Sequence, residues 1–131
     1  MANGLFIVLE GIDGSGTTTQ MDRLANHFRN EGRTVHTTAE PSTHPIGKMI
    51  RDVLEKRQTL PPNALALAFA ADRLDHLEKE IEPALENGTL VIADRYVLSS
   101  LAYQSLAAPL EWVVSINSLA KSPDRSFLLQ V

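Results

Sequence analysis

The chain has 131 residues, 44% of them hydrophobic, and a formal net charge of -4. This length and composition predict a single globular domain with one core, and the acidic balance argues against a nucleic-acid partner. No apolar run is long enough to cross a bilayer, so we expect no membrane partner. The absence of cysteine excludes disulfides and thiolate metal sites, and it fits a cytoplasmic location.

The chain opens with a buried strand, a glycine-rich loop and an amphipathic helix. Leu5–Leu9 is a continuous apolar run, typical of a strand that is covered on both faces. Glycines are concentrated between Gly11 and Gly16, and apolar residues then recur at helical spacing as far as Phe28. Gly32 is expected to end this helix, and the β-branched segment 34–38 predicts a second strand.

The rest of the chain continues to alternate between helices and strands. We predict, in order, a short helix over 46–54, a longer helix that starts at Pro62, bends at Pro83 and ends at Gly88, a buried strand over 90–93, helices over 97–107 and 111–119, and a strand over 127–131. This alternation predicts an α/β fold with a parallel sheet flanked by helices. In such sheets, ligands bind beyond the carboxyl ends of the strands.

The segment between the first strand and the first helix has the context of a Walker A phosphate-binding loop. Its glycines allow successive N–H groups to face phosphate oxygens, and the helix amino terminus favours negative charge. Thr17 stands where the motif has a lysine, and Thr18 supplies the hydroxyl expected on Mg²⁺. A tight turn without a ligand is the alternative. The predicted ATP phosphate-binding residues are Gly11, Asp13, Gly14, Ser15, Gly16, Thr17, Thr18 and Thr19.

Four motifs together resemble the thymidylate kinase family of P-loop nucleoside-monophosphate kinases. They occur in the family's order and at about its spacing, and they span most of the chain. The motifs are Phe6–Gly16, then Glu40-Pro41 with Pro45–Arg51, then Phe69–Arg73, and last Asp94–Tyr96 with Ser99–Gln104. The resemblance implies a three-layer P-loop fold and transfer of the γ-phosphoryl group of ATP to dTMP.

The resemblance also implies a role for individual residues in binding dTMP. Phe69 would stack on the thymine ring, while Arg73 and Gln104 would hydrogen-bond the base edge. Arg51 and Arg95 would face the phosphate of dTMP. The full set implied for dTMP is Asp13 near the 3′-hydroxyl, Tyr103 beside the deoxyribose, Glu40 and Ser42 in the lining, and Arg51, Phe69, Arg73, Arg95, Ser99, Ser100 and Gln104.

The catalytic residues implied by the resemblance are Asp13, Arg95 and Asp94, and Mg²⁺ would accompany ATP. Thr18 and Asp94 would hold the metal. Arginine suits phosphate because its planar N–H donors are paired, and phosphoryl transfer mainly requires positioning and neutralisation of charge. Taken singly, Phe69 could be a core residue, Arg51 a solvated charge and Asp94–Arg95 a surface ion pair.

The chain departs from the family pattern in several places. Thr17 replaces the lysine, Gly14 stands where some members have an arginine, and Gln130 stands where an acidic residue is common. The family's chain continues through an arginine-bearing lid, so the 131-residue domain is expected to be incomplete relative to the family. Because loss of a well-placed cation is costly in phosphoryl transfer, we expect stronger dTMP binding than catalysis.

Three functions remain open from the sequence. The first is a dTMP kinase, the second is a kinase for another nucleotide or deoxynucleoside, and the third is a catalytically impaired nucleotide-binding homologue. The family's usual homodimer is also expected, with Ala64, Leu67 and Ala68 offering a small apolar surface.

Overall fold

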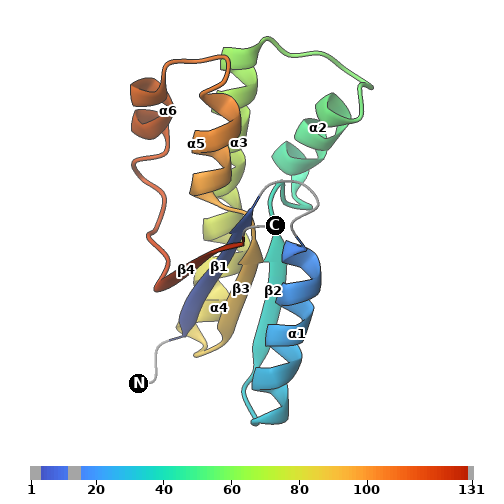
Figure 1. Ribbon diagram of the computed structural model, residues 1–131, viewed down its shortest axis with the longest axis vertical. Helices are drawn as coiled ribbons and strands as arrows, with labels where there is room; N and C mark the ends of the chain where they lie inside the picture. Colours follow the sequence, from blue (N-terminus) through green and yellow to red (C-terminus); the bar gives the residue numbers. More distant parts are fainter. Residues whose placement is uncertain (1–3, 12–15, 130–131) are drawn as a thin grey trace.

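A computed structural model describes residues 4–11 and 16–129 (Figure 1). Four parallel strands form one sheet in the order β2-β3-β1-β4. Their bounds are β1 Leu5–Gly11, β2 Val35–Ala39, β3 Leu90–Asp94 and β4 Arg125–Leu129. The helical elements are α1 Thr17–Asn30, α2 Pro45–Leu54, α3 Pro62–His76, η1 Leu77–Ile81, α4 Glu82–Glu86, α5 Val97–Gln104 and α6 Leu110–Ile116. The predicted α/β fold with a parallel sheet between helices is confirmed.

Helices cover both faces of the sheet because the central strands are apolar on both sides. Met21 and Ala25 of α1 pack with Ile7, Leu9 and Ile92 on one face. On the other face, the core is built from Phe6, Val8, Leu77, Ile81, Leu85, Val91, Ala93 and Tyr96. Figure 1 shows α1 and α4 on opposite sides of the strands, while α3, α5 and α6 lie toward one end of the sheet.

The helix that starts at Pro62 continues through a wider π-helical turn, η1, which ends two residues before Pro83. Proline lacks an N–H group, and its ring collides with the carbonyl group four residues earlier in a regular α-helix. A π turn at this point is a known way to relieve such a conflict. The bend predicted at Pro83 therefore corresponds to a change of helix type.

Three predicted boundaries near the carboxyl terminus were wrong. Helix α6 ends at Ile116, before the predicted limit at Leu119. Helix α5 ends at Gln104, before the predicted limit at Ala107, because the next turn tightens through bonds from Leu106 N to Tyr103 O and from Ala107 N to Gln104 O. Strand β4 begins at Arg125, two positions earlier than expected. Asp124 accepts a hydrogen bond from Phe6 N at 2.8 Å, which aligns the two strands from that point. Residues 130–131 lie outside the described residues.

The start of α2 packs very closely against the preceding loop. A Cβ atom added at Gly47 would lie 2.0 Å from the carbonyl oxygen of Ser42. Both Gly47 and Ser42 are buried. A glycine is therefore required here by the close approach of two backbone segments.

We expect Gly47→Ala to lower the free energy of unfolding by about 1–3 kcal/mol, because the added methyl group forces α2 away from the loop. Urea unfolding checks this. Lys48→Ala is the control, since Lys48 is an exposed neighbour on the same helix, and it should change stability by less than about 0.5 kcal/mol. Equal stability of Gly47→Ala and the unmodified chain would show that the loop can move without cost.

Candidate active site

The strand register brings the ends of three strands to one edge of the sheet. Ala39 lies opposite Asp94, and Asp94 lies opposite Leu9. The segments that follow these strands contain Glu40, Arg95 and the glycine-rich loop. This is the edge at which α/β proteins bind ligands.

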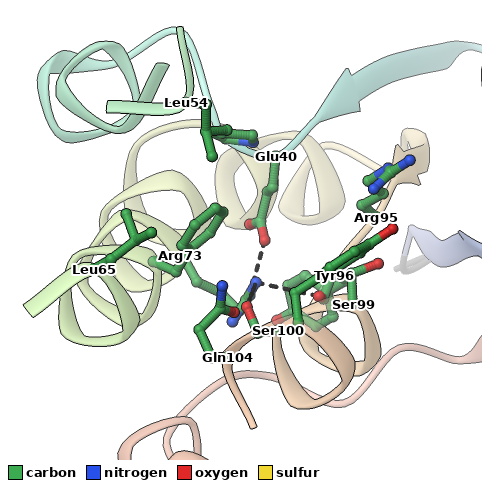
Figure 2. A pocket seen from close by; sticks show the side chains of 12 residues that line it. Glu40, Leu54, Leu65, Arg73, Arg95, Tyr96, Ser99, Ser100 and Gln104 are labelled. Carbon is green, nitrogen blue, oxygen red and sulfur yellow. Dashed lines mark hydrogen bonds and ion pairs between the residues drawn. The ribbon is translucent and has the colours of Figure 1, made fainter. Parts of the chain in front are cut away.

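A pocket of about 330 Å³ opens at this edge, between α3, α5 and the loop after β2 (Figure 2). Phe69 and Arg73 lie one helical turn apart on α3, and Gln104 enters from α5. Phe69, Arg73 and Gln104, which come from two different helices, therefore line the same cavity. The complete lining is Glu40, Pro41, Leu54, Leu65, Phe69, Arg73, Arg95, Tyr96, Ser99, Ser100, Tyr103 and Gln104.

The amide of Gln104 brings an unused acceptor to this pocket. Its Oε1 atom is buried and has no hydrogen-bond partner among the described residues. Buried polar atoms without partners are rare, because each loses its bonds to water. Gln104 Oε1 is therefore available to accept a hydrogen bond from a ligand donor.

Arg73 makes four hydrogen bonds, and it is only 2% exposed. Its Nε donates to Glu40 Oε1 at 2.8 Å, and its Nη2 donates to Ser100 Oγ at 2.9 Å and to Tyr96 O at 3.2 Å. Nη1 donates to Asn117 Oδ1. Four of the five guanidinium N–H groups are thus engaged within the described residues, which leaves one Nη1 N–H for a ligand. Figure 2 draws the bond between Arg73 and Glu40.

Next to Arg73 lies a cluster of histidines and glutamates in which His76 and Glu40 are buried and His36, His44 and Glu80 are partly exposed. His76 Nδ1 bonds Glu40 Oε2 at 2.9 Å, and His76 Nε2 bonds Thr38 Oγ1 at 2.8 Å. Glu80 forms hydrogen bonds with two further histidines, from Oε2 to His36 Nε2 at 2.7 Å and from Oε1 to His44 Nε2 at 3.0 Å. Glu40 is therefore shared between Arg73 and His76, and its carboxylate faces the pocket already neutralised.

This cluster shifts the pKa values of two of its members. Burial opposes protonation of His76, but the hydrogen bond and charge of Glu40, with the charges of Glu80 and Asp72, raise the pKa of His76. Burial likewise acts to raise the pKa of Glu80, yet bonds from Thr38 and the histidines lower it to about 2. The folded protein thus favours a charged His76 beside a charged Glu80.

Asp72 and Arg51 hold the loop that carries Glu40. Asp72 is 1% exposed, and its carboxylate accepts bonds from Ser42 N at 2.8 Å and Ser42 Oγ at 2.6 Å. Arg51 is exposed and donates through Nη2 to Pro41 O. Ser42 and Arg51 lie outside the pocket lining, and Arg51 borders a neighbouring cavity with Glu80.

Arg95 connects β3 to α5 through an unusual backbone conformation, with φ at +75°. Its N–H donates to Leu9 O at 2.8 Å, and its guanidinium lies 5.9 Å from the centre of the Tyr103 ring. Left-handed φ values are uncommon for a residue with a side chain. They persist only where surrounding contacts hold them in place, and they are concentrated at functional sites.

The hydroxyl groups of the two predicted serines point to protein groups. Ser99 Oγ donates to Glu10 Oε1 at 2.7 Å, while Ser100 Oγ accepts from Arg73. Both residues line the pocket, so they connect it to buried charges on β1 and α3. Direct contact of either serine with a ligand stays a prediction.

Thr18 and Asp94 form a pair at the start of α1. Thr18 Oγ1 donates to Asp94 Oδ2 at 2.8 Å, and the buried Asp94 Oδ1 has no hydrogen-bond partner among the described residues. A carboxylate and a hydroxyl fit Mg²⁺, which takes one or two protein ligands together with phosphate oxygens and water. Within residues 4–11 and 16–129, no cluster of three or more His, Asp or Glu side chains could enclose a metal ion by itself.

The phosphate loop is only partly described. Asp13, Gly14 and Ser15 lie outside the described residues, so the roles predicted for them stay predictions. Gly16 has a left-handed φ of +86° and directly precedes α1, Thr17 is 5% exposed, and Thr19 is exposed. The residue at the lysine position is thus buried.

Sequence reasoning missed several residues that organise the site. Glu10 binds the start of α5, Asn117 after α6 binds Arg73, and Asp72 binds the loop after β2. Asp72 and Glu10 lie within motifs that the sequence showed, yet their polar partners are distant in the chain. Asn117 lies outside every motif, and we find no sequence signal that could have identified it.

The comparisons with known proteins agree with this geometry. The thymidylate kinase family model matches residues 9–131. The chain belongs to the thymidylate kinase family. It is 47% identical over 134 residues to a probable thymidylate kinase of Pyrococcus abyssi, covering 98% of this chain and 65% of the relative. A thymidylate kinase of Bifidobacterium longum is 45% identical over 139 residues, covering 98% of this chain and 68% of the relative.

A solved structure of the same family has the same fold. The crystal structure of thymidylate kinase from Ehrlichia chaffeensis matches with a TM-score of 0.87 at 34% identity, covering 98% of this chain and 73% of that chain. Compared with the Pyrococcus relative, the chain spans 65% of the full length. Within the described part of the chain, no helix is both long enough and apolar enough to span a membrane.

The histidine cluster of this family member predicts a stability optimum in mildly acidic solution. Because folding raises the pKa of His76 above 6.5, its contribution is complete below that pH and is lost as the pH rises through the folded value. Because folding lowers the pKa of Glu80 from 4.5 to about 2, its contribution is present above 4.5 and is lost as the pH falls toward 2.

We therefore expect the free energy of unfolding to decrease above about pH 6.5 and below about pH 4.5. His76→Gln should flatten the alkaline slope, as measured by urea unfolding across the pH range. His27→Gln is the matched control, because His27 forms an exposed pair with Glu31 at 3.7 Å. An unchanged alkaline slope in His76→Gln would contradict this assignment.

Proposed function

We propose that the protein binds dTMP in the pocket between α3 and α5 and transfers to it the γ-phosphoryl group of ATP. The observation that carries this proposal is the convergence of Phe69, Arg73 and Gln104 on one cavity at the edge of the sheet where the parallel strands end. Membership of the thymidylate kinase family supports the same assignment.

The pocket offers groups that complement thymine. Its N3–H is a donor for Gln104 Oε1, which is buried and otherwise unpartnered among the described residues. A base carbonyl can accept the remaining Arg73 N–H, and the partly buried Phe69 ring provides a surface for stacking. Tyr103, which is 38% exposed at the pocket, would pack beside the deoxyribose.

Positive charge near the pocket mouth would hold the phosphate of dTMP. Arg95 lines the pocket, and Arg51 donates a hydrogen bond to the carbonyl oxygen of Pro41, another lining residue. Arginine is suited to this task because its N–H groups can bind two phosphate oxygens at once. Asp13, proposed to lie near the 3′-hydroxyl, is outside the described residues.

The donor phosphates would bind at the amino terminus of α1, where backbone N–H groups lack helical partners. Thr18 and Asp94 would hold Mg²⁺, which neutralises charge on the phosphates when it is bound. A phosphate oxygen of dTMP forms a new bond to the γ-phosphorus of ATP. The bond between the γ-phosphorus and the oxygen that bridges it to the β-phosphate breaks, and this oxygen leaves with ADP. Arg95 would position and neutralise the transferring group, so no strong base is needed.

A kinase for a different nucleotide and a binding protein with little turnover are the alternatives. Thr17 favours the second, since a threonine supplies no charge to the phosphates. Turnover assays with dTMP, dUMP and dCMP, combined with calorimetry of dTMP and ATP binding, separate the three. Preference for another nucleotide would support the first alternative, and binding without turnover the second.

We also propose a homodimer in the cytoplasm without nucleic-acid or membrane partners. The surface on α3 differs from the expected one, because Ala68 is only 9% exposed and packs within its own chain. Leu67 and Leu74 are 49% and 39% exposed and lie two helical turns apart. Leu74 therefore takes the place of Ala68 beside Leu67 and the partly exposed Ala64 in the proposed apolar contact, and light scattering of Leu67→Glu tests it.

We expect Gln104→Leu to weaken dTMP binding at least about tenfold, because the pocket loses its acceptor for the base N3–H. ATP affinity should stay the same, since Gln104 lies away from α1. Calorimetry with each nucleotide measures both. Gln58→Leu is the control, because Gln58 lies on an exposed loop after α2. Unchanged dTMP affinity in Gln104→Leu would contradict the proposed base recognition.

We expect Thr17→Lys to increase the rate of dTDP formation at saturating ATP by about tenfold or more, because it restores a cation at the phosphates. A coupled assay for ADP measures the rate. Gln20→Lys, which adds the same charge one turn further along α1, should have little effect. If Thr17→Lys folds but gives no gain, another group already neutralises the phosphates.

A further inference from the structure

Glu10 is a buried carboxylate at the end of an otherwise apolar strand. It is 2% exposed and directly precedes Gly11, the first residue of the phosphate loop. Burial of a carboxylate is strongly unfavourable unless hydrogen bonds replace its water. The position therefore requires several donors from the surrounding protein.

Four donors from the start of α5 meet this carboxylate. Glu10 Oε1 accepts from Tyr96 N at 2.9 Å, from Ser99 N at 3.2 Å and from Ser99 Oγ at 2.7 Å. Glu10 Oε2 accepts from Leu98 N at 2.9 Å. Hydrogen bonds to a charged acceptor are about twice as strong as neutral ones.

Through these bonds, a side chain of β1 caps the amino terminus of α5. The first N–H groups of a helix have no partner within the helix, and the N-cap residue of α5, Tyr96, makes no side-chain capping bond. Glu10 takes that role across 86 residues of sequence. Its negative charge also interacts favourably with the amino-terminal end of the helix dipole.

The helix held in this way carries much of the proposed dTMP pocket. Ser99, Ser100, Tyr103 and Gln104 all lie on α5 and line the cavity. With eight residues, α5 is too short to be stable alone, so its placement depends on outside contacts. Figure 1 shows α5 above the end of β1, where this connection is made.

We propose that Glu10 is a positioning residue, which fixes α5 relative to β1 and thereby sets the geometry of the base pocket. This inference rests on the proposed function for its effect on dTMP. The carboxylate does not line that pocket, so its influence passes through the backbone of α5.

The test uses Glu10→Gln, which keeps the shape of the side chain but turns one acceptor into a donor. The new NH₂ group must face at least one of the converging N–H groups, so the start of α5 is displaced. We expect dTMP affinity, measured by calorimetry well below the melting temperature, to fall at least about tenfold. Amide exchange at Leu98 and Ser99 should become faster.

Asp124→Asn is the matched control, because Asp124 also binds a backbone N–H of β1, at Phe6 and 2.8 Å, but at the other end of the strand. We expect it to lower stability while leaving dTMP affinity within about twofold of the unmodified chain. If Glu10→Gln does not fold, Glu10→Asp is used, which keeps the charge but withdraws the carboxylate by one methylene group.

Two failures can be distinguished. If the unmodified chain binds dTMP and folded Glu10→Gln or Glu10→Asp binds it equally well, Glu10 is not a positioning residue. If the unmodified chain does not bind dTMP, the proposed function fails, and the amide exchange of Leu98 and Ser99 decides whether Glu10 holds α5. If the amides of Leu98 and Ser99 exchange at the same rate in the folded Glu10 variant as in the unmodified chain, the inference is overturned.

Discussion

The site depends on a buried cation, the guanidinium of Arg73, and on the carboxylate of Glu40 that neutralises it. Their side chains are 2% and 3% exposed, and their charged atoms lie 2.8 Å apart. Such a pair contributes little net stability, because both charges have lost their water. Removal of one partner, however, leaves an unpaired buried charge, so each of them enforces the position of the other. The loop after β2 and helix α3 are thereby held in one arrangement.

Two polar networks meet on helix α5. Glu10 binds its first backbone N–H groups from β1, and Arg73 binds Ser100 Oγ and the carbonyl of Tyr96 from α3. The helix is therefore fixed from the phosphate-loop side and from the pocket side. A short helix with few internal hydrogen bonds becomes a defined wall because charged groups on its neighbours satisfy its end.

Most of the correct predictions came from patterns among residues that are close in the sequence. The apolar run ending at Leu9 and the glycines after it indicated β1 and its loop, and the spacing of Phe69 and Arg73 placed both on one face of α3. The partners of Glu10 and Asn117 could not be predicted, since they lie 86 and 44 residues away. The start of β4 was missed because Arg125 and Ser126 are polar, and its alignment depends on Asp124.

At Arg95, the left-handed backbone conformation lowers the stability of the fold, while the side chain serves the proposed reaction. An L-residue in this conformation costs about 1–2 kcal/mol, a penalty that glycine avoids. Under the proposed function, the guanidinium there is worth keeping because it faces the transferring phosphate. Selection for heat resistance alone would therefore favour glycine at this position, and such variants would gain melting temperature as they lose turnover.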